Sequence, residues 1–213
     1  MGWWTDRVVP HVVHAALDNP GLEQLRRETT EGLHGEVLEI GFGSGLNLPH
    51  LPDAVTAVHA VDPSDVGWRM SEQARGASRV PVDRVGLDGA GRIDAEDRSF
   101  DDVLITFTLC TVPDRDAVLS EVRRLLRPGG ALHLLEHGRD PRPVAARAQD
   151  VLNPVQKALV GGCHTNRVVL EPFESPGWVL QSSAADHVGP RVMLPLLNHL
   201  TRAVAVPVAV AAA

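Results

Sequence analysis

Tyrosine is absent from this chain of 213 residues, and only one of its 20 basic side chains, Lys157, is a lysine. The chain has 27 acidic residues, which outnumber the 20 basic ones. A chain with this balance lacks the broad positive surface that nucleic-acid binding requires, so we expect no nucleic-acid partner. Long apolar runs are also absent. None approaches the roughly 20 residues of a membrane span, and Pro207 interrupts the apolar tail, so we expect no integral membrane span.

Cysteine is scarce as well. The two cysteines, Cys110 and Cys163, lie far apart in the sequence and match no metal-binding spacing. His11 and His14 share one face of an expected helix, but two histidines alone make a poor metal site. The sequence therefore predicts no metal. Two thiols without a signal peptide indicate a reducing compartment, and we expect a soluble, cytoplasmic protein of undetermined oligomeric state.

Short apolar runs alternate with helical patterns after residue 34. The expected strands cover residues 36–40, 57–62, 80–85, 102–108 and 131–136. The expected helices cover residues 3–17, 21–31, 64–76, 114–127 and 143–160. Strands that alternate with helices indicate parallel βαβ units and an open sheet covered on both faces. Two late strand-like runs, 178–184 and 202–209, are expected to pair antiparallel at a sheet edge.

The stretch VLEIGFGSGLN (37–47) places Gly41, Gly43 and Gly45 after an expected strand and before an expected helix. Open α/β sheets bind their ligands at this carboxyl end of a strand. A phosphate-binding loop would need Gly-Lys-Ser/Thr after its glycines, and a dinucleotide fingerprint would need glycine or alanine where Leu46 stands. The absence of tyrosine also excludes a short-chain dehydrogenase with a catalytic Tyr and Lys. The glycines therefore indicate another ligand.

Three acids end successive expected strands, at Glu39, Asp62 and Asp88. Asp62 follows the glycines by about 20 residues, a spacing that suits hydrogen bonds from ribose hydroxyls. Asp88 could receive the amino group of an adenine. Acids grouped in this way suit a nucleoside that carries positive charge, such as S-adenosylmethionine, better than they suit a polyphosphate.

Residues 35–137 resemble a class I S-adenosylmethionine-dependent methyltransferase. The words VLEIGFGSG, VDPS, SFDDVLITFTLCTV and EVRRLLRPGGALHLLEHG occur in the order and spacing of that family. The resemblance implies an α/β, Rossmann-like fold, with a seven-stranded and mostly parallel sheet, helices on both faces and a C-terminal antiparallel strand pair. It implies a single domain over residues 1–213, composed of an N-terminal helical cap (1–34), a cofactor-binding core (35–137) and an acceptor-side helix, loop and final hairpin (138–213).

The same resemblance implies S-adenosylmethionine as the cofactor, and it implies contacts to it. Those contacts are Glu39, Gly41, Gly43, Gly45, Asn47, Asp62, Pro63, Asp88, Gly89, Thr106 and Leu109. Glu39 and the glycines would face the methionine part, Asp62 the ribose, and Asp88 with Gly89 the adenine. One departure concerns the adenine contacts, because GLDGAGRIDAEDRSFD is polar where the family usually has an apolar Leu-Pro pair.

The second half of the chain carries a narrower resemblance. TLCTV, LLEHGRDP and VLNPVQKALVGGCHTNR resemble the thiol methyltransferase-like (methyltransferase type 11) branch, which implies a small-molecule acceptor and S-methylation of a thiol. A thiolate that attacks a sulfonium removes two charges, so a dry pocket favours the reaction. His137 or His164 could act as the base, although either could instead shape its loop. Two alternatives stay open, namely a small-molecule O- or C-methyltransferase of quinone or natural-product type and a cofactor-binding module without catalysis.

Overall fold

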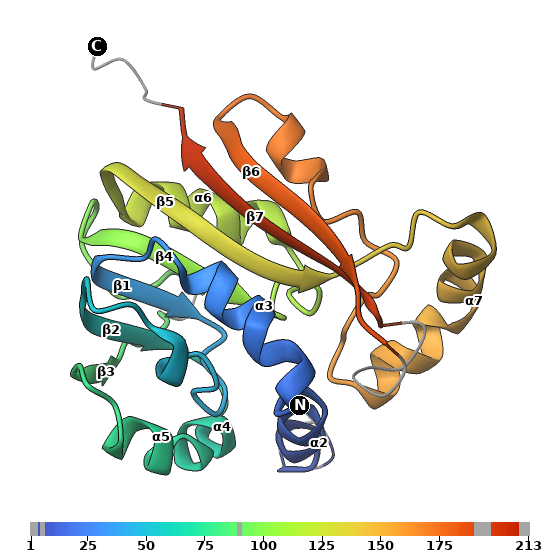
Figure 1. Ribbon diagram of the computed structural model, residues 1–213, viewed down its shortest axis with the longest axis horizontal. Helices are drawn as coiled ribbons and strands as arrows, with labels where there is room; N and C mark the ends of the chain where they lie inside the picture. Colours follow the sequence, from blue (N-terminus) through green and yellow to red (C-terminus); the bar gives the residue numbers. More distant parts are fainter. Residues whose placement is uncertain (1–3, 5–6, 89–90, 190–196, 209–213) are drawn as a thin grey trace.

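A computed structural model describes residues 4, 7–88, 91–189 and 197–208 (Figure 1). Seven strands form one sheet in the order β3-β2-β1-β4-β5-β7-β6. The strands are β1 (Gly35–Ile40), β2 (Val55–Val61), β3 (Val82–Arg84), β4 (Phe100–Thr106), β5 (Leu126–His137), β6 (Trp178–His187) and β7 (His199–Pro207). β7 pairs antiparallel with both β5 and β6, and the other neighbours are parallel. The predicted sheet and its late antiparallel pair are confirmed.

Helices cover both faces of the sheet. The helices are α2 (Val9–Leu17), α3 (Pro20–Thr30), α4 (Asp65–Met70), α5 (Glu72–Gly76), α6 (Arg115–Leu125) and α7 (Pro143–Leu159), with short 3₁₀ turns η1 (Leu48–His50) and η2 (Glu171–Glu174). Successive side chains of a strand point to opposite faces, so Leu134 and Leu135 of β5 serve two different cores. Leu134 belongs to the cluster that contains Val122 of α6, whereas Leu135 packs with Leu22 and Leu25 of α3.

Two helix predictions were wrong in detail. The helix expected over residues 64–76 is interrupted at Ser71, whose hydroxyl donates to the carbonyl oxygen of Trp68 at 2.7 Å and ends α4. The glycine turn does not open an α-helix, and only η1 follows it. Pro49 and Pro52 stand in this stretch, and a proline has no backbone N–H with which to extend a helix.

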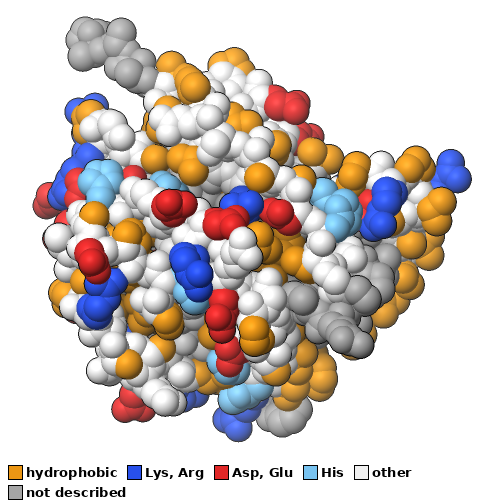
Figure 2. Space-filling view, in the orientation of Figure 1, with side chains coloured by type: hydrophobic (Ala, Val, Ile, Leu, Met, Phe, Trp, Pro, Cys, Tyr) orange, Lys and Arg blue, Asp and Glu red, His pale blue; other side chains and the backbone are white. Residues whose placement is uncertain are grey.

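α7 lies at one edge of the molecule, and part of its surface is apolar (Figure 2). Val151 is 75% exposed and Val155 is 57% exposed, and Leu159 at the end of the helix is also exposed. Within the described parts of the chain, no helix combines the length and the apolar character that crossing a bilayer would require.

Candidate active site

A cleft of about 1220 Å³ opens at the carboxyl ends of β1, β2 and β4. The turn after β1, the residue that follows β2 and Thr106 at the end of β4 form its middle. One side is lined from α2, by residues that include Val9 and Val13, and the other from α6 and the segment around Ile93. The predicted position of the ligand site at the strand ends therefore coincides with the large cleft.

The three glycines of the turn have different tasks. Gly41, Gly43 and Gly45 have φ of +80°, +56° and +76°, a region that side chains with a Cβ rarely adopt. A Cβ at Gly41 would overlap the side chain of Thr108, and one at Gly45 would press on Leu48 at 3.3 Å. A Cβ at Gly43 would meet nothing closer than the carbonyl oxygen of Gly41, at 4.0 Å. Gly41 and Gly45 are thus required by packing, and Gly41 also lines the cleft, whereas Gly43 leaves the cleft open to a ligand.

Asp62 joins the end of β2 to this turn. Its Oδ2 accepts a hydrogen bond from the N–H of Gly43 at 2.6 Å, and its Oδ1 accepts one from the N–H of Ser64 at 2.7 Å. Each carboxylate oxygen keeps a further lone pair, so Asp62 can also accept hydrogen bonds from ribose hydroxyls. Pro63, the next residue, lines the cleft as predicted.

Glu39 lies behind the cleft in a buried polar network. Its Oε1 accepts a hydrogen bond from Asn47 Nδ2 at 2.8 Å. The same Asn47 Nδ2 also donates to Thr106 Oγ1 at 3.0 Å. On its other side, Asn47 Oδ1 accepts a hydrogen bond from Arg26 Nη1 at 2.7 Å. Burial raises the pKa of Glu39 to about 7, against the lowering effects of the Asn47 hydrogen bond and the Arg26 charge. Glu39 Oε2 is buried and has no hydrogen-bond partner among the described residues. A cationic ligand would compensate such a group, so the network fits the charge of S-adenosylmethionine.

Arg26 was missed by the sequence analysis. Its side chain is buried on the face of α3 that also carries Leu22, Leu25 and Thr29, and its guanidinium lies 5.5 Å from the centre of the Phe107 ring. Burial lowers the pKa of Arg26 to about 10. The sequence feature that could have identified Arg26 is an arginine at a position of the apolar face of an amphipathic helix.

Two of the predicted cofactor contacts, Asp88 and Leu109, do not line the cleft. The Asp88 side chain is exposed, its Oδ1 accepts from the N–H of Arg92 at 2.8 Å, and neighbouring Leu87 lines the cleft instead. Leu109 is buried in the core, whereas Thr108 and Thr111 of the same loop line the cleft. Gly89 lies outside the described residues. The roles of Asp88, Gly89 and Leu109 stay predictions.

Neither predicted base lines the cleft. His137 is buried, with its Nε2 2.6 Å from Cys163 Sγ and its ring stacked on Phe107. His164 is half-buried, and burial lowers the pKa of its imidazole. The histidine that does line the cleft, among the described residues, is His14, whose Nδ1 is 2.8 Å from Ser44 Oγ.

Glu136, the first residue of the EHG word, holds the loop that follows β4. Its Oε1 accepts two hydrogen bonds at 2.6 Å, from the N–H groups of Thr108 and Leu109. Burial raises the pKa of Glu136 to about 7. Phe107, which begins this loop, has φ of +52°, a sparsely populated conformation for a residue with a side chain. The buried carboxylate therefore fixes one wall of the cleft.

Comparisons with known proteins agree with this geometry. The family described as "Methyltransferase domain" matches residues 38–134. A phosphatidylethanolamine N-methyltransferase of Cereibacter sphaeroides is 35% identical over 142 residues, which cover 64% of this chain and 66% of that protein. Thiol S-methyltransferase TMT1B of Rattus norvegicus is 33% identical over 149 residues, covering 68% of this chain and 61% of that protein. The chain thus spans less than two thirds of the length of either relative.

Solved structures show the same fold. The crystal structure of an S-adenosylmethionine-dependent methyltransferase from Mesorhizobium loti has a TM-score of 0.65 at 16% identity, over 89% of this chain and 99% of that one. Identity this low supports the fold alone. Residues 38–134 therefore belong to a methyltransferase domain family, and the chain has the fold of class I S-adenosylmethionine-dependent methyltransferases.

Proposed function

We propose that this chain transfers a methyl group from S-adenosylmethionine to a small thiol, forming a thioether. When bound, S-adenosylmethionine supplies a methyl group on a sulfonium. In the proposed arrangement Asp62 receives the ribose hydroxyls, and the buried Glu39 network compensates the positive charge from behind the cleft. Leu87 and Ile93 offer apolar surface to the adenine.

The observation that carries the thiol assignment is the composition of the α2 side of the cleft. This side is lined from three segments: α2, the loop of residues 107–113, and Gly161 with Gly162 after α7. A Cβ built on Gly161 would lie 2.9 Å from Val9 Cγ1, so α2 closes tightly on that turn. None of the three segments contains a carboxylate.

A wall without a carboxylate favours acceptors that lose their proton easily. An alcohol or phenol needs strong assistance from a base, whereas a thiol with a pKa of about 8.5 ionises to a useful extent near neutral pH. Charge is lost when a thiolate meets a sulfonium, and a wall that is mostly apolar, with His14 as its ionisable side chain, favours that loss. The relative named as a thiol S-methyltransferase supports the same acceptor class.

The test is a competition between matched acceptors. The purified protein is given S-adenosylmethionine with a labelled methyl group, a short-chain alkyl thiol and the corresponding alcohol, and products are quantified by mass spectrometry. The proposal expects the thioether to form faster than the ether. A faster reaction of the alcohol would overturn the thiol assignment and favour the O-methyltransferase alternative.

The base is a separate question. His137 and His164 remain candidates from sequence, but the geometry favours His14, because its ring borders the cleft. If His14 takes the thiol proton, His14→Gln should slow the reaction most below the thiol pKa of about 8.5, and the loss should shrink near pH 9. A loss that is independent of pH would assign His14 to positioning.

One observation favours a second candidate acceptor, an amphiphilic amine. The exposed apolar residues of α7 lie on the helix that leads to Gly161, at the acceptor side of the cleft. The relative from Cereibacter sphaeroides is named for methylation of phosphatidylethanolamine. Vesicles that contain phosphatidylethanolamine, tested with the same labelled cofactor, should give no methylated lipid if the thiol proposal is right.

A further inference from the structure

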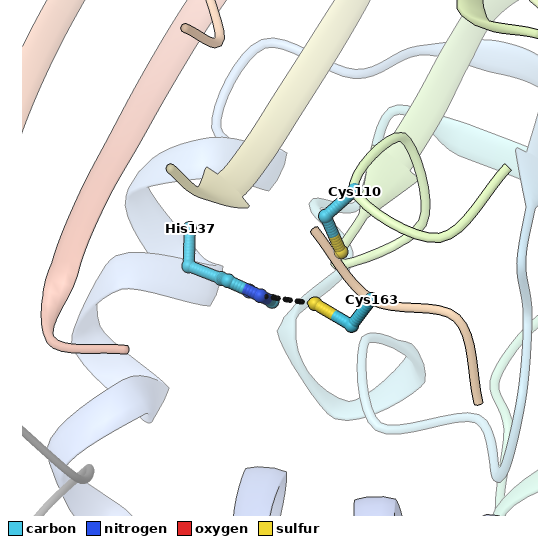
Figure 3. A group of neighbouring side chains, drawn as sticks. All are labelled: Cys110, His137 and Cys163. Carbon is cyan, nitrogen blue, oxygen red and sulfur yellow. Dashed lines mark hydrogen bonds between the residues drawn. The ribbon is translucent and has the colours of Figure 1, made fainter. Parts of the chain in front are cut away.

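The fold gathers the chain's two cysteines around a histidine. Cys110 lies in the loop after β4, His137 ends β5, and Cys163 follows α7, and all three side chains are buried. Both sulfur atoms and a ring nitrogen of His137 lie within 4.8 Å of one another (Figure 3). His137 Nε2 points at Cys163 Sγ, at 2.6 Å.

We propose that Cys110, His137 and Cys163 bind a divalent transition-metal ion, with zinc the best match, and that Glu136 completes the site. Two thiolates and one imidazole are ligands that zinc prefers, and such three-ligand sets accept a fourth donor in tetrahedral geometry. Sequence spacing predicted no metal because the three residues lie on separate segments that only the sheet brings together.

Glu136 is suited to be the fourth ligand. Its Oε2 is buried without a hydrogen-bond partner among the described residues, and the Cys110 thiol is its neighbour. A small cavity of about 10 Å³ is lined by Cys110, Glu136 and His137 together with Arg167. A volume of this size is roughly that of one water molecule. Cys163 does not line this cavity, so an ion held by all four side chains would lie at the cavity's edge toward Cys163. It would satisfy a carboxylate oxygen that has no hydrogen-bond partner among the described residues.

The surrounding charge fits an occupied site. A divalent ion with two thiolates and one carboxylate leaves one negative charge. Arg167 can balance that charge, because its Nη1 is fixed beside the site by the carbonyl oxygens of Leu109 and Val112, at 2.6 Å and 2.8 Å. The guanidinium therefore acts on the ligand set from outside it.

Metal binding requires one local adjustment. In a tetrahedral zinc site a histidine nitrogen and a cysteine sulfur lie about 3.5 Å apart, so the His137–Cys163 pair must open by about 1 Å. Cys163 follows Gly161 and Gly162, which have φ of +61° and +92°, and its N–H bond to the Val160 carbonyl is long, at 3.3 Å. The turn can move without breaking a helix or strand.

The consequence is a clamp behind the acceptor side of the cleft. Thr111, next to Cys110, and Gly162, next to Cys163, both line the cleft. A metal ion would fix these two walls relative to each other. This role does not depend on which acceptor is methylated, so the proposal stands or falls separately from the proposed function.

The metal itself is the readout. Tag-free protein is produced in zinc-supplemented medium, dialysed, and analysed for metal by plasma mass spectrometry, and we expect about one zinc per chain. Cobalt substitution should give the intense near-ultraviolet absorption of cobalt–thiolate bonds. Cys163→Ser and Cys110→Ser should lose the metal, whereas His164→Gln, beside the cluster and outside it, should retain it.

If the cysteine variants fail to fold, metal binding can still be tested with the wild-type protein. A strong chelator should then lower the melting temperature of the wild-type protein, and added zinc should restore it. Protein with negligible zinc after supplementation, or a melting temperature unaffected by chelator and zinc, would overturn the proposal. A Cys110–Cys163 disulfide in the zinc-supplemented protein would overturn it as well.

Discussion

Asp62 Oδ2 accepts a hydrogen bond of 2.6 Å from the backbone N–H of Gly43, which joins the end of β2 to the turn after β1. The bond holds Gly43, which leaves the cleft open, in a fixed position relative to Asp62, which is expected to bind the ribose. Preorganisation of this kind means that a ligand meets the turn and the carboxylate already in place.

Asp62→Ala should weaken binding of S-adenosylmethionine by about 1–3 kcal/mol, because buried ribose hydroxyls would lose their acceptor. Titration calorimetry of the variant and the wild-type protein measures the difference. Asp62→Asn should lose less, since its amide oxygen can still accept one hydrogen bond. Asp83→Ala, at an exposed position on β3, is the matched control. Equal affinity of Asp62→Ala and wild type would refute the ribose assignment.

Gly43→Val should abolish measurable cofactor binding in a chain that still folds. The branched side chain would enter the open cleft, and it resists the φ of +56°. Circular dichroism checks the fold and calorimetry the binding. Gly76→Ala, where an added Cβ meets no atom within 4 Å, should bind normally. A Gly43→Val protein that binds the cofactor would make this turn purely structural.

Glu39 should make stability and cofactor affinity depend on pH in opposite directions. Burial raises its pKa to about 7, so the folded protein holds a proton that the unfolded chain releases above the ordinary pKa of 4.5. The contribution of Glu39 to stability is therefore present at low pH and is lost as pH rises toward 7, by at most about 3 kcal/mol. The difference in unfolding free energy between wild type and Glu39→Gln, measured from pH 4 to 8, should follow this trend.

Cofactor affinity should rise over the same interval, because a cation favours the ionised form of Glu39. Glu39→Gln should flatten that rise, and Glu31→Gln, at an exposed position, should leave it intact. An identical pH dependence in wild type and Glu39→Gln would show that the cofactor does not sense this carboxyl.

Arg26→Gln should destabilise the fold by about 2–3 kcal/mol and weaken cofactor binding, since Asn47 would lose the donor that orients it toward Glu39. Thermal unfolding and calorimetry test the two effects. Arg27→Gln removes the same charge at the next, exposed position of α3 and should change stability by less than about 0.5 kcal/mol. Equal effects of both substitutions would contradict a specific role for Arg26.

Local signals account for what could be predicted from sequence. The alternation of apolar runs and helices placed the parallel strands, and the glycines with Asp62 located the cleft, because each depends on neighbouring residues. The helix expected after the glycine turn failed because Pro49 and Pro52 restrict the backbone there.

Residues whose surroundings are set by distant segments could not be placed in this way. Arg26 contacts Asn47 and Phe107, which meet α3 only in the folded chain. Cys110 and Cys163 are 53 positions apart in the printed sequence, yet their sulfur atoms lie within 4.8 Å. Spacing along the chain carries no information about such contacts.

The most direct test of the central claim follows the methyl group itself. Wild-type protein at a concentration above that of S-adenosylmethionine carrying a labelled methyl group is mixed with an apolar thiol, and cofactor and thioether are followed in one turnover. We expect the label to leave the cofactor and appear in the thioether at equal rates, and Gly43→Val to show neither change. Cofactor that binds tightly but keeps its label across thiol, alcohol and amine acceptors would contradict the account and identify a binding module without catalysis.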